Sequence, residues 1–164
     1  MKTKPTTQLV ERESVWDYPR PPAVEDVPQR IKIVFNGQII VDSQNAKRVL
    51  ETSHPPTYYI PLEDIEPEAL QPAPARTWCE WKGEARYYDV LIGERIAESA
   101  AWYYPNPVPD YAEIKDHVAF YASKMEACFV GDERVKSQPG TFYGGWITSN
   151  IAGPFKGVPG TSGW

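Results

Sequence analysis

The sequence predicts a mainly β fold (α+β at most), built from antiparallel strands with one or two short helices. Its 17 prolines are about twice the ~5% of average usage, and clusters at 19–22, 54–56 and 105–109 interrupt helices and sheet interiors. Short turns separate runs of β-branched and aromatic residues, without the strand–helix alternation of a parallel nucleotide-binding sheet. The 164 residues suffice for one domain with an ordinary hydrophobic core.

The stretch IKIVFNGQIIVD (31–42) predicts a β-hairpin. Its two β-branched runs flank Asn36-Gly37, because this pair readily adopts the positive φ angles that a type I′ turn needs at both central positions.

The next elements are short. Residues 43–51 are expected to form about two helical turns, which end before the prolines that follow. TYYIP (57–61) predicts a strand. Residues 62–70 are expected to form a loop or a single acidic turn, because Pro67 prevents a long helix.

Three further runs, at 76–81, 84–92 and 95–104, predict an antiparallel meander because only glycine-containing turns separate them. Residues 109–121 have helical spacing and predict a short helix, with a strand at the end of this segment as the alternative. A last hairpin is expected within 125–136.

The two ends of the chain differ from its middle. Residues 1–30 predict an extended Pro-rich arm, in which SVWDYPRPP (14–22) has aromatic anchors. Residues 139–164 are rich in Gly and Pro with spaced aromatics, which is typical of a disordered tail with a few docking anchors. The β domain is therefore expected to span 31–138.

Charge and composition exclude several partners. The formal charge of −5 and the pI near 5.1, with no compensating Lys/Arg run, disfavour nucleic acid. No apolar run approaches the ~18–20 residues of a membrane span, and the polar start lacks the apolar segment of a secretory signal. We expect a cytoplasmic protein without membrane contact.

No metal or other cofactor is expected. Structural zinc needs four Cys or His ligands in paired short spacings, and the chain has two isolated Cys and two isolated His. Cys79 and Cys128 are expected to stay free in a reducing compartment. Phosphate-loop spacing and a G-x-S-x-G elbow are also absent, so kinase and hydrolase functions lose their usual support.

The stretch RTWCEWKGEARYYDV (76–90) is the first candidate site. Strand alternation predicts two faces, Trp78, Glu80 and Lys82 on one and Thr77, Cys79 and Trp81 on the other. A lysine with aromatic walls, near Glu84 and Arg86, would bind an anion or a planar ligand. The alternative is a solvated sheet face with cross-strand charge pairs, which antiparallel sheets normally show.

Two shorter stretches add candidates. Glu51 and His54 lie beside a rigid Pro-Pro corner, where His54 would act as an acid or base tuned by Glu51. The alternative is a loop-packing histidine, because no nucleophile accompanies it. Trp102 and Tyr104 share a strand face and would form either the wall of an aromatic cage or part of the core.

Six motifs occur in order between residues 14 and 136: SVWDYPRPP, FNGQIIVDS, VLETSHPPTYYIPLEDI, TWCEWKGEARYYDV, AAWYYPNP and HVAFY. Together they resemble the bacterial family known as domain of unknown function 427. The ending GGWITSNIAGPFKGVPGTSGW is similar to an extension of cyanobacterial members.

The resemblance implies a β-tent fold similar to the Mss4-like group, which includes zinc-bearing methionine sulfoxide reductases and the thalidomide-binding domain of cereblon. Those relatives hold zinc with Cys-x-x-Cys pairs, whereas Glu80 and Trp81 follow Cys79 here, so zinc does not carry over. Sulfoxide reduction does not carry over either, because neither cysteine has an obvious activating partner. An aromatic-walled small-molecule cleft is implied by analogy of fold alone.

The leading hypothesis is a domain that binds a small planar or anionic molecule in a cleft, with Glu51 and His54 at its rim. The residues expected to border the cleft are Tyr59, Trp81, Lys82, Trp102 and Tyr104. Any catalysis there would be proton transfer, with His54, Lys82 and Glu51 as the candidate residues.

Two alternatives come from other classes. A protein-docking module would use the WDYPRPP arm (16–22) and the Trp-bearing tail. A nucleotidyltransferase-like enzyme is suggested by a label attached to the family. That chemistry needs paired carboxylates holding Mg²⁺, and the chain offers only scattered acids such as Asp132-Glu133.

Overall fold

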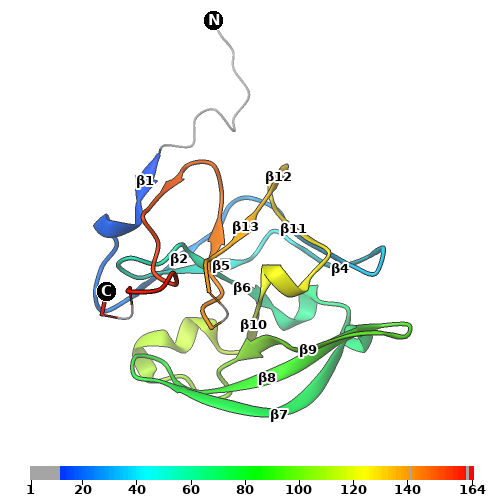
Figure 1. The fold of residues 1–164 in the computed structure, drawn as a ribbon. Coiled ribbons are helices and arrows are strands. Elements are labelled where there is room, and N and C mark those ends of the chain that lie inside the picture. Colours follow the sequence, from blue (N-terminus) through cyan, green and yellow to red (C-terminus); the bar gives the residue numbers. More distant parts are fainter. Residues whose placement is uncertain (1–11, 141, 162) are drawn as a thin grey trace, which may run out of the picture.

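Two antiparallel sheets dominate the computed structural model, which describes residues 12–140, 142–161 and 163–164 (Figure 1). The larger sheet has the order β2 (Ala23–Asp26), β5 (Lys47–Leu50), β6 (Thr57–Pro61), β10 (His117–Phe120), β9 (Arg95–Tyr103), β8 (Gly83–Ile92) and β7 (Leu70–Cys79). The smaller sheet has the order β12 (Glu133–Arg134), β11 (Ala127–Val130), β3 (Ile31–Phe35) and β4 (Gln38–Ser43). The expected mainly β, antiparallel fold is confirmed.

Short 3-10 helices connect these strands: η2 (Val15–Asp17), η3 (Leu62–Asp64), η4 (Pro67–Ala69), η5 (Pro109–Ile114) and η6 (Ala122–Lys124). No helix in the described part of the chain is long and apolar enough to cross a membrane.

The two hairpin predictions and the meander are confirmed. At the β3–β4 turn Asn36 has φ 50° and Gly37 has φ 76°, as a type I′ turn requires. Strands β7, β8 and β9 pair in sequence order, and β11 pairs with β12. Strand β7 begins earlier than expected, at Leu70, because an edge strand can accommodate Pro72, after which its register with β8 shifts.

Two helix predictions need correction. The expected helix over 43–51 is wrong: strand β5 lies there, hydrogen-bonded between β2 and β6. Two neighbouring strands outweigh the weak propensity of a segment long enough for only two helical turns. Within 109–121, the helix is limited to η5, and β10 follows it, as in the alternative for that segment.

The larger sheet packs against a hydrophobic core on each of its two faces around β6. Along β6, Tyr58 and Ile60 point into a core shared with the smaller sheet, and Tyr59 points to the opposite face. We call the first the inter-sheet core and the second the outer core. Cys128 belongs to the inter-sheet core and Cys79 packs against the outer core, and both thiols are free.

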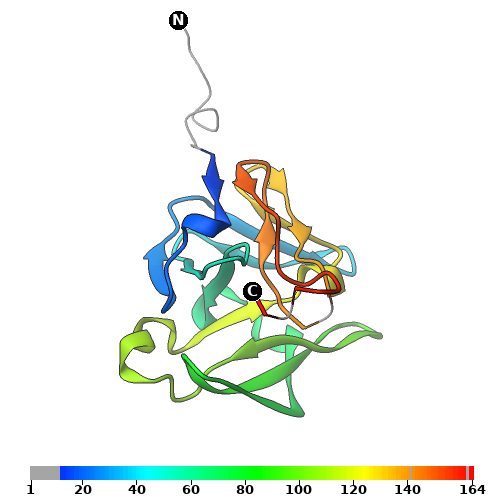
Figure 2. The ribbon, with the colours of Figure 1, turned by 60° about the vertical axis from the view of Figure 1, so that its left-hand side comes forward.

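The C-terminal segment is folded onto the body in its described part, contrary to the expected disorder. Strand β14 (Trp146–Ile147) pairs with β13 (Lys136–Ser137), and β15 (Ile151–Ala152) pairs in parallel with β1 (Glu13–Ser14). Trp146, 1% exposed, stacks on Tyr58 with ring centroids 5.0 Å apart. Figures 1 and 2 show this orange and red segment reaching down toward the green strands.

The N-terminal arm is also attached to the body where it is described. Tyr18 is buried, and its carbonyl oxygen accepts a hydrogen bond from the Thr52 hydroxyl (2.5 Å). Strand β2 forms one edge of the larger sheet. Residues 1–11 of the expected arm lie outside the described residues.

Candidate functional site

A pocket of about 280 Å³ opens over the outer core. It brings together all seven residues of the cleft hypothesis: Glu51, His54, Tyr59, Trp81, Lys82, Trp102 and Tyr104. They come from the β5–β6 connection, from β6, from the β7–β8 turn and from the end of β9 and the residue after it. We call this cavity the aromatic pocket.

Buried aromatic rings form much of its wall. Trp102 and Tyr121 have ring centroids 4.6 Å apart, and those of Tyr59 and Tyr104 are 6.4 Å apart. Burial raises the pKa of Tyr59, Tyr104 and Tyr121, so these phenols are protonated near neutral pH. Trp102 and Tyr104 therefore serve as outer-core residues and as pocket wall at once.

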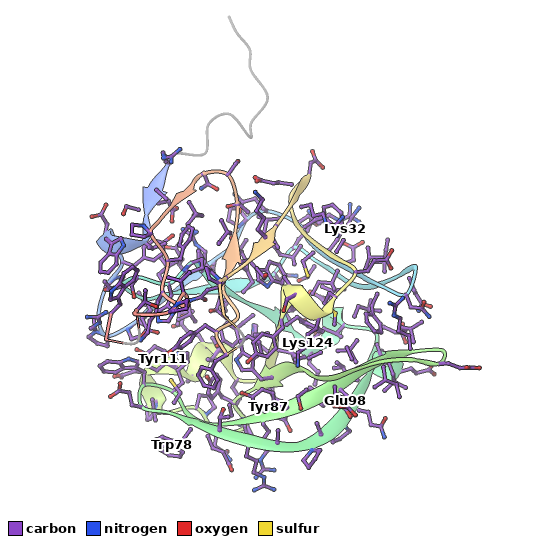
Figure 3. All side chains as sticks on the ribbon, viewed as in Figure 1. Lys32, Trp78, Tyr87, Glu98, Tyr111 and Lys124 are labelled. Atoms are coloured by element: carbon purple, nitrogen blue, oxygen red, sulfur yellow. The ribbon has the colours of Figure 1, made fainter. Side chains whose placement is uncertain are left out.

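Lys82 enters the pocket from a turn and not from a strand. Side chains alternate between the two faces of the sheet as far as Cys79, where β7 ends. Residues 80–82 form a turn, and Gly83, with φ 110°, follows it. Lys82 therefore does not share the face of Trp78, as strand alternation had predicted. Trp78 is 75% exposed on the outside of the sheet (Figure 3), and Lys82 is 6% exposed.

The surroundings of Lys82 are aromatic. Its Nζ lies 5.9 Å from the ring centroids of both Tyr104 and Tyr111, within cation–π range. The Nζ also donates to Cys79 Sγ at 3.5 Å. None of the ion pairs formed by the described residues includes Lys82.

Lys82 is the one charged side chain among the buried residues that the structure describes. Because buried charges are normally paired, its position favours a negative group from outside the chain. The alternative for residues 76–90 was a solvated sheet face with cross-strand charge pairs. It describes only the side of this stretch that faces away from the pocket. There Glu84 lies 3.5 Å from both Arg76 and Arg86, so neither Glu84 nor Arg86 assists Lys82.

A hydrogen-bond network fixes the tautomer of His54. Gly145 N donates to Gln138 Oε1 (3.0 Å), and Gln138 Nε2 donates to the carbonyl oxygen of Lys156 (2.9 Å), which sets the orientation of the amide. The same Nε2 donates to His54 Nδ1 at 3.0 Å. The proton of neutral His54 is therefore on Nε2, which lies 4.0 Å from a carboxylate oxygen of Glu51.

His54 is held neutral. Burial is the largest cause, followed by the positive charges of Lys156 and Lys82, and together they lower its pKa to about 4. Near neutral pH the imidazole therefore presents an N–H donor, and its other nitrogen is already occupied as an acceptor.

The C-terminal segment contributes a wall that the sequence analysis missed. Phe142, Tyr143, Gly144 and Lys156 of this segment line the pocket, together with Gln138 just before it. Gly144 is required for this close approach, since a Cβ there would lie 2.2 Å from the indole of Trp102. The spaced aromatics and glycines of this segment indicated that it contacts a folded surface. They did not indicate which surface it contacts.

A larger pocket, about 590 Å³, lies elsewhere, beside β2 and β12. Its cation, Arg48, is already paired, 3.0 Å from Glu13 and 2.5 Å from Glu25. The rest of its charged lining is acidic, with Asp26, Asp132 and Glu133, so among the described residues this larger pocket presents no unpaired cation comparable to Lys82.

Comparison with protein families identifies the chain. Residues 23–131, more than half of its length, match the family described as a domain of unknown function (DUF427). The chain belongs to the DUF427 family. No curated protein matches it.

The residues that line the pocket fall into two groups, inside and outside the DUF427 match. All seven residues of the cleft hypothesis fall inside it, whereas Gln138, Tyr143 and Lys156 lie beyond its end. In this DUF427 protein the segment after the family domain therefore completes the pocket. Among the described residues, no group of three or more His, Cys, Asp or Glu is arranged to hold a metal ion.

Proposed function

We propose that this DUF427 protein binds a small planar or anionic molecule in the aromatic pocket. The observation that carries the proposal is Lys82, which is buried between aromatic rings without a carboxylate partner among the described residues. An unpaired buried charge costs several kcal/mol. An anionic ligand would offset that cost, and flat aromatic walls favour a planar one.

If the protein is also an enzyme, its chemistry would involve proton transfer in this pocket. The hydrogen bond from Gln138 to Nδ1 supports His54 as a donor through Nε2–H more than as a general base. Lys82 and Glu51 remain the other candidate residues for such a transfer.

The docking-module alternative has less support. The termini make contacts within the chain: Trp146 is buried, and Trp16 Nε1 donates to the carbonyl oxygen of Pro154 (2.9 Å). The nucleotidyltransferase alternative gains nothing from Asp132 and Glu133, which border the larger pocket and not the aromatic pocket.

The β-tent, Mss4-like relationship also stands as a proposal. The two antiparallel sheets packed around the inter-sheet core support it. An experimental structure compared with that group would test it.

The function is tested by native mass spectrometry of protein purified from its own host, with the intact mass compared before and after denaturation. We expect a non-covalent ligand to be retained by the wild type. The variants Lys82→Met and Trp102→Leu should lose it with their circular dichroism spectra unchanged, and the exposed-lysine control Lys115→Met should keep it. Retention by both pocket variants, or a wild type that carries no ligand and gives no thermal shift with any metabolite, would refute the proposal.

A further inference from the structure

The charges of the aromatic pocket determine which anions it suits. Lys82 and Lys156 each contribute one positive charge, and Glu51 contributes one negative charge. His54 is neutral near pH 7 because of its lowered pKa. The net charge of these groups is therefore 2 − 1 = +1.

A second acid of the lining, Glu80, would bring the formal count to zero, but it is placed differently from Glu51. Glu80 lies in the β7–β8 turn and is exposed to water. Solvent and salt screen an exposed carboxylate, so its effect inside the pocket is small compared with that of buried Lys82.

The donors Lys82, Lys156 and His54 all line this one pocket. Both lysines act electrostatically on the imidazole of His54, and Lys156 Nζ lies 5.2 Å from the ring of Tyr143, which in turn packs edge-on against His54 with ring centroids 4.7 Å apart. Two ammonium groups and one N–H donor thus line the cavity that a ligand's anionic group would enter. Glu51, 4.0 Å from His54 Nε2, repels a second negative charge there.

The remaining wall and the size of the pocket restrict the rest of the ligand. Trp81, Trp102, Tyr59 and Tyr104 offer aromatic surface, and about 280 Å³ is slightly below the ~300–1,000 Å³ of sites for drug-sized ligands. One or two fused rings suit this space better than a nucleotide.

Resting on the function proposed above, we infer that the ligand is an aromatic monoanion, one or two rings bearing a single carboxylate-type group. The anionic group is held by Lys82, Lys156 and His54 Nε2–H, and Glu51 selects against dianions. Lys156 lies after the DUF427 match, so the C-terminal segment supplies part of this selectivity.

Three probes of matched shape test the inference on the full chain: 2-naphthoate (a monoanion), 2-naphthamide (neutral) and 2-naphthyl phosphate (a dianion at pH 8). Isothermal titration calorimetry should give the carboxylate an affinity about 10- to 100-fold above that of the amide, the change expected for one charge-assisted hydrogen bond. The phosphate should also bind more weakly than the carboxylate.

Variants assign the preference to residues. Lys82→Met should abolish the advantage of carboxylate over amide, and Lys156→Met should reduce it. Glu51→Gln should raise the affinity of the phosphate relative to the carboxylate, because the repelling charge is gone. The exposed-lysine control Lys115→Met should change none of these ratios.

The outcomes separate the two proposals. If the amide or the phosphate binds as tightly as the carboxylate, or if Glu51→Gln leaves the phosphate unaffected, the monoanion inference is overturned and ligand binding itself stands. If no probe binds and the purified protein retains no molecule, both proposals are overturned.

Discussion

Acidification should destabilise the protein through His54. The unfolded chain takes up this proton near pH 6.5, and the folded chain only near pH 4, because burial is the largest cause of the lowered pKa. Between these values the unfolded state binds more protons, so the free energy of unfolding falls as the pH falls. The contribution is complete above pH 6.5 and is lost by about pH 4.

The size of the effect follows from the same shift. The difference of 6.5 − 4, or about 2.5 pH units, corresponds to about 3 kcal/mol at about 1.4 kcal/mol per unit. Only 12% of the side chain is exposed, so solvent screening reduces this value little. Such a loss is a large part of the ~5–15 kcal/mol that stabilises an ordinary domain.

Urea unfolding followed by tryptophan fluorescence at several pH values between 4.5 and 7.5 measures the effect. The wild type should lose about 1.4 kcal/mol per pH unit more than His54→Gln below pH 6.5, since carboxylates titrating in the same range cancel in the difference. The control His117→Gln, at the chain's other histidine, should keep the wild-type slope. Parallel curves for the wild type and His54→Gln would refute the buried, neutral imidazole.

Three further predictions concern packing. Trp146→Ala should lower the free energy of unfolding by about 3–5 kcal/mol, because it empties a fully buried site, whereas Trp78→Ala should stay within about 0.5 kcal/mol. Gly144→Ala should lower the thermal midpoint and weaken binding of the naphthalene probes, because its Cβ would lie 2.2 Å from the Trp102 ring and overpacking costs about 1–3 kcal/mol. Cys128 should react with an aromatic disulfide reagent only after denaturation, because burial raises the pKa of its thiol.

Controls separate these effects from general damage. Gly163→Ala has no neighbour within 4 Å of the added Cβ and should leave the midpoint unchanged. A Cys79→Ser background leaves Cys128 as the single thiol, so a fast native reaction there would contradict its burial. An unchanged urea midpoint for Trp146→Ala would mean that the C-terminal segment does not contribute to the stability of the fold.

Local chemistry made part of the fold predictable. The Asn36-Gly37 turn and the meander over β7, β8 and β9 depend on turn residues and β-branched runs that lie next to each other in sequence. Strand β5 was not predictable in this way, because its strand character comes from hydrogen bonds to β2 and β6, which the residues of β5 themselves do not indicate.

The candidate site, like the fold, was predictable only where neighbouring residues in the sequence carry the information. Aromatic and charged clusters beside prolines pointed to seven residues, and one pocket contains them all. The position of Lys82 in the pocket could not be predicted, because the alternation of side chains along a strand does not indicate where the strand ends. Gln138, at the end of the expected β domain, and Lys156, in the C-terminal segment, were missed because only the folded chain brings them to each other and to His54.

The pairing of β1 with β15 has a consequence for synthesis of the chain. Glu13 lies beside Ile151, and the backbone N–H of Glu13 donates to the carbonyl oxygen of Asn150 (2.8 Å). The ribosome therefore makes strand β1 long before its partner β15. We therefore expect the strands between them to assemble first, with β1 unable to complete its pairing until β15 has emerged from the ribosome.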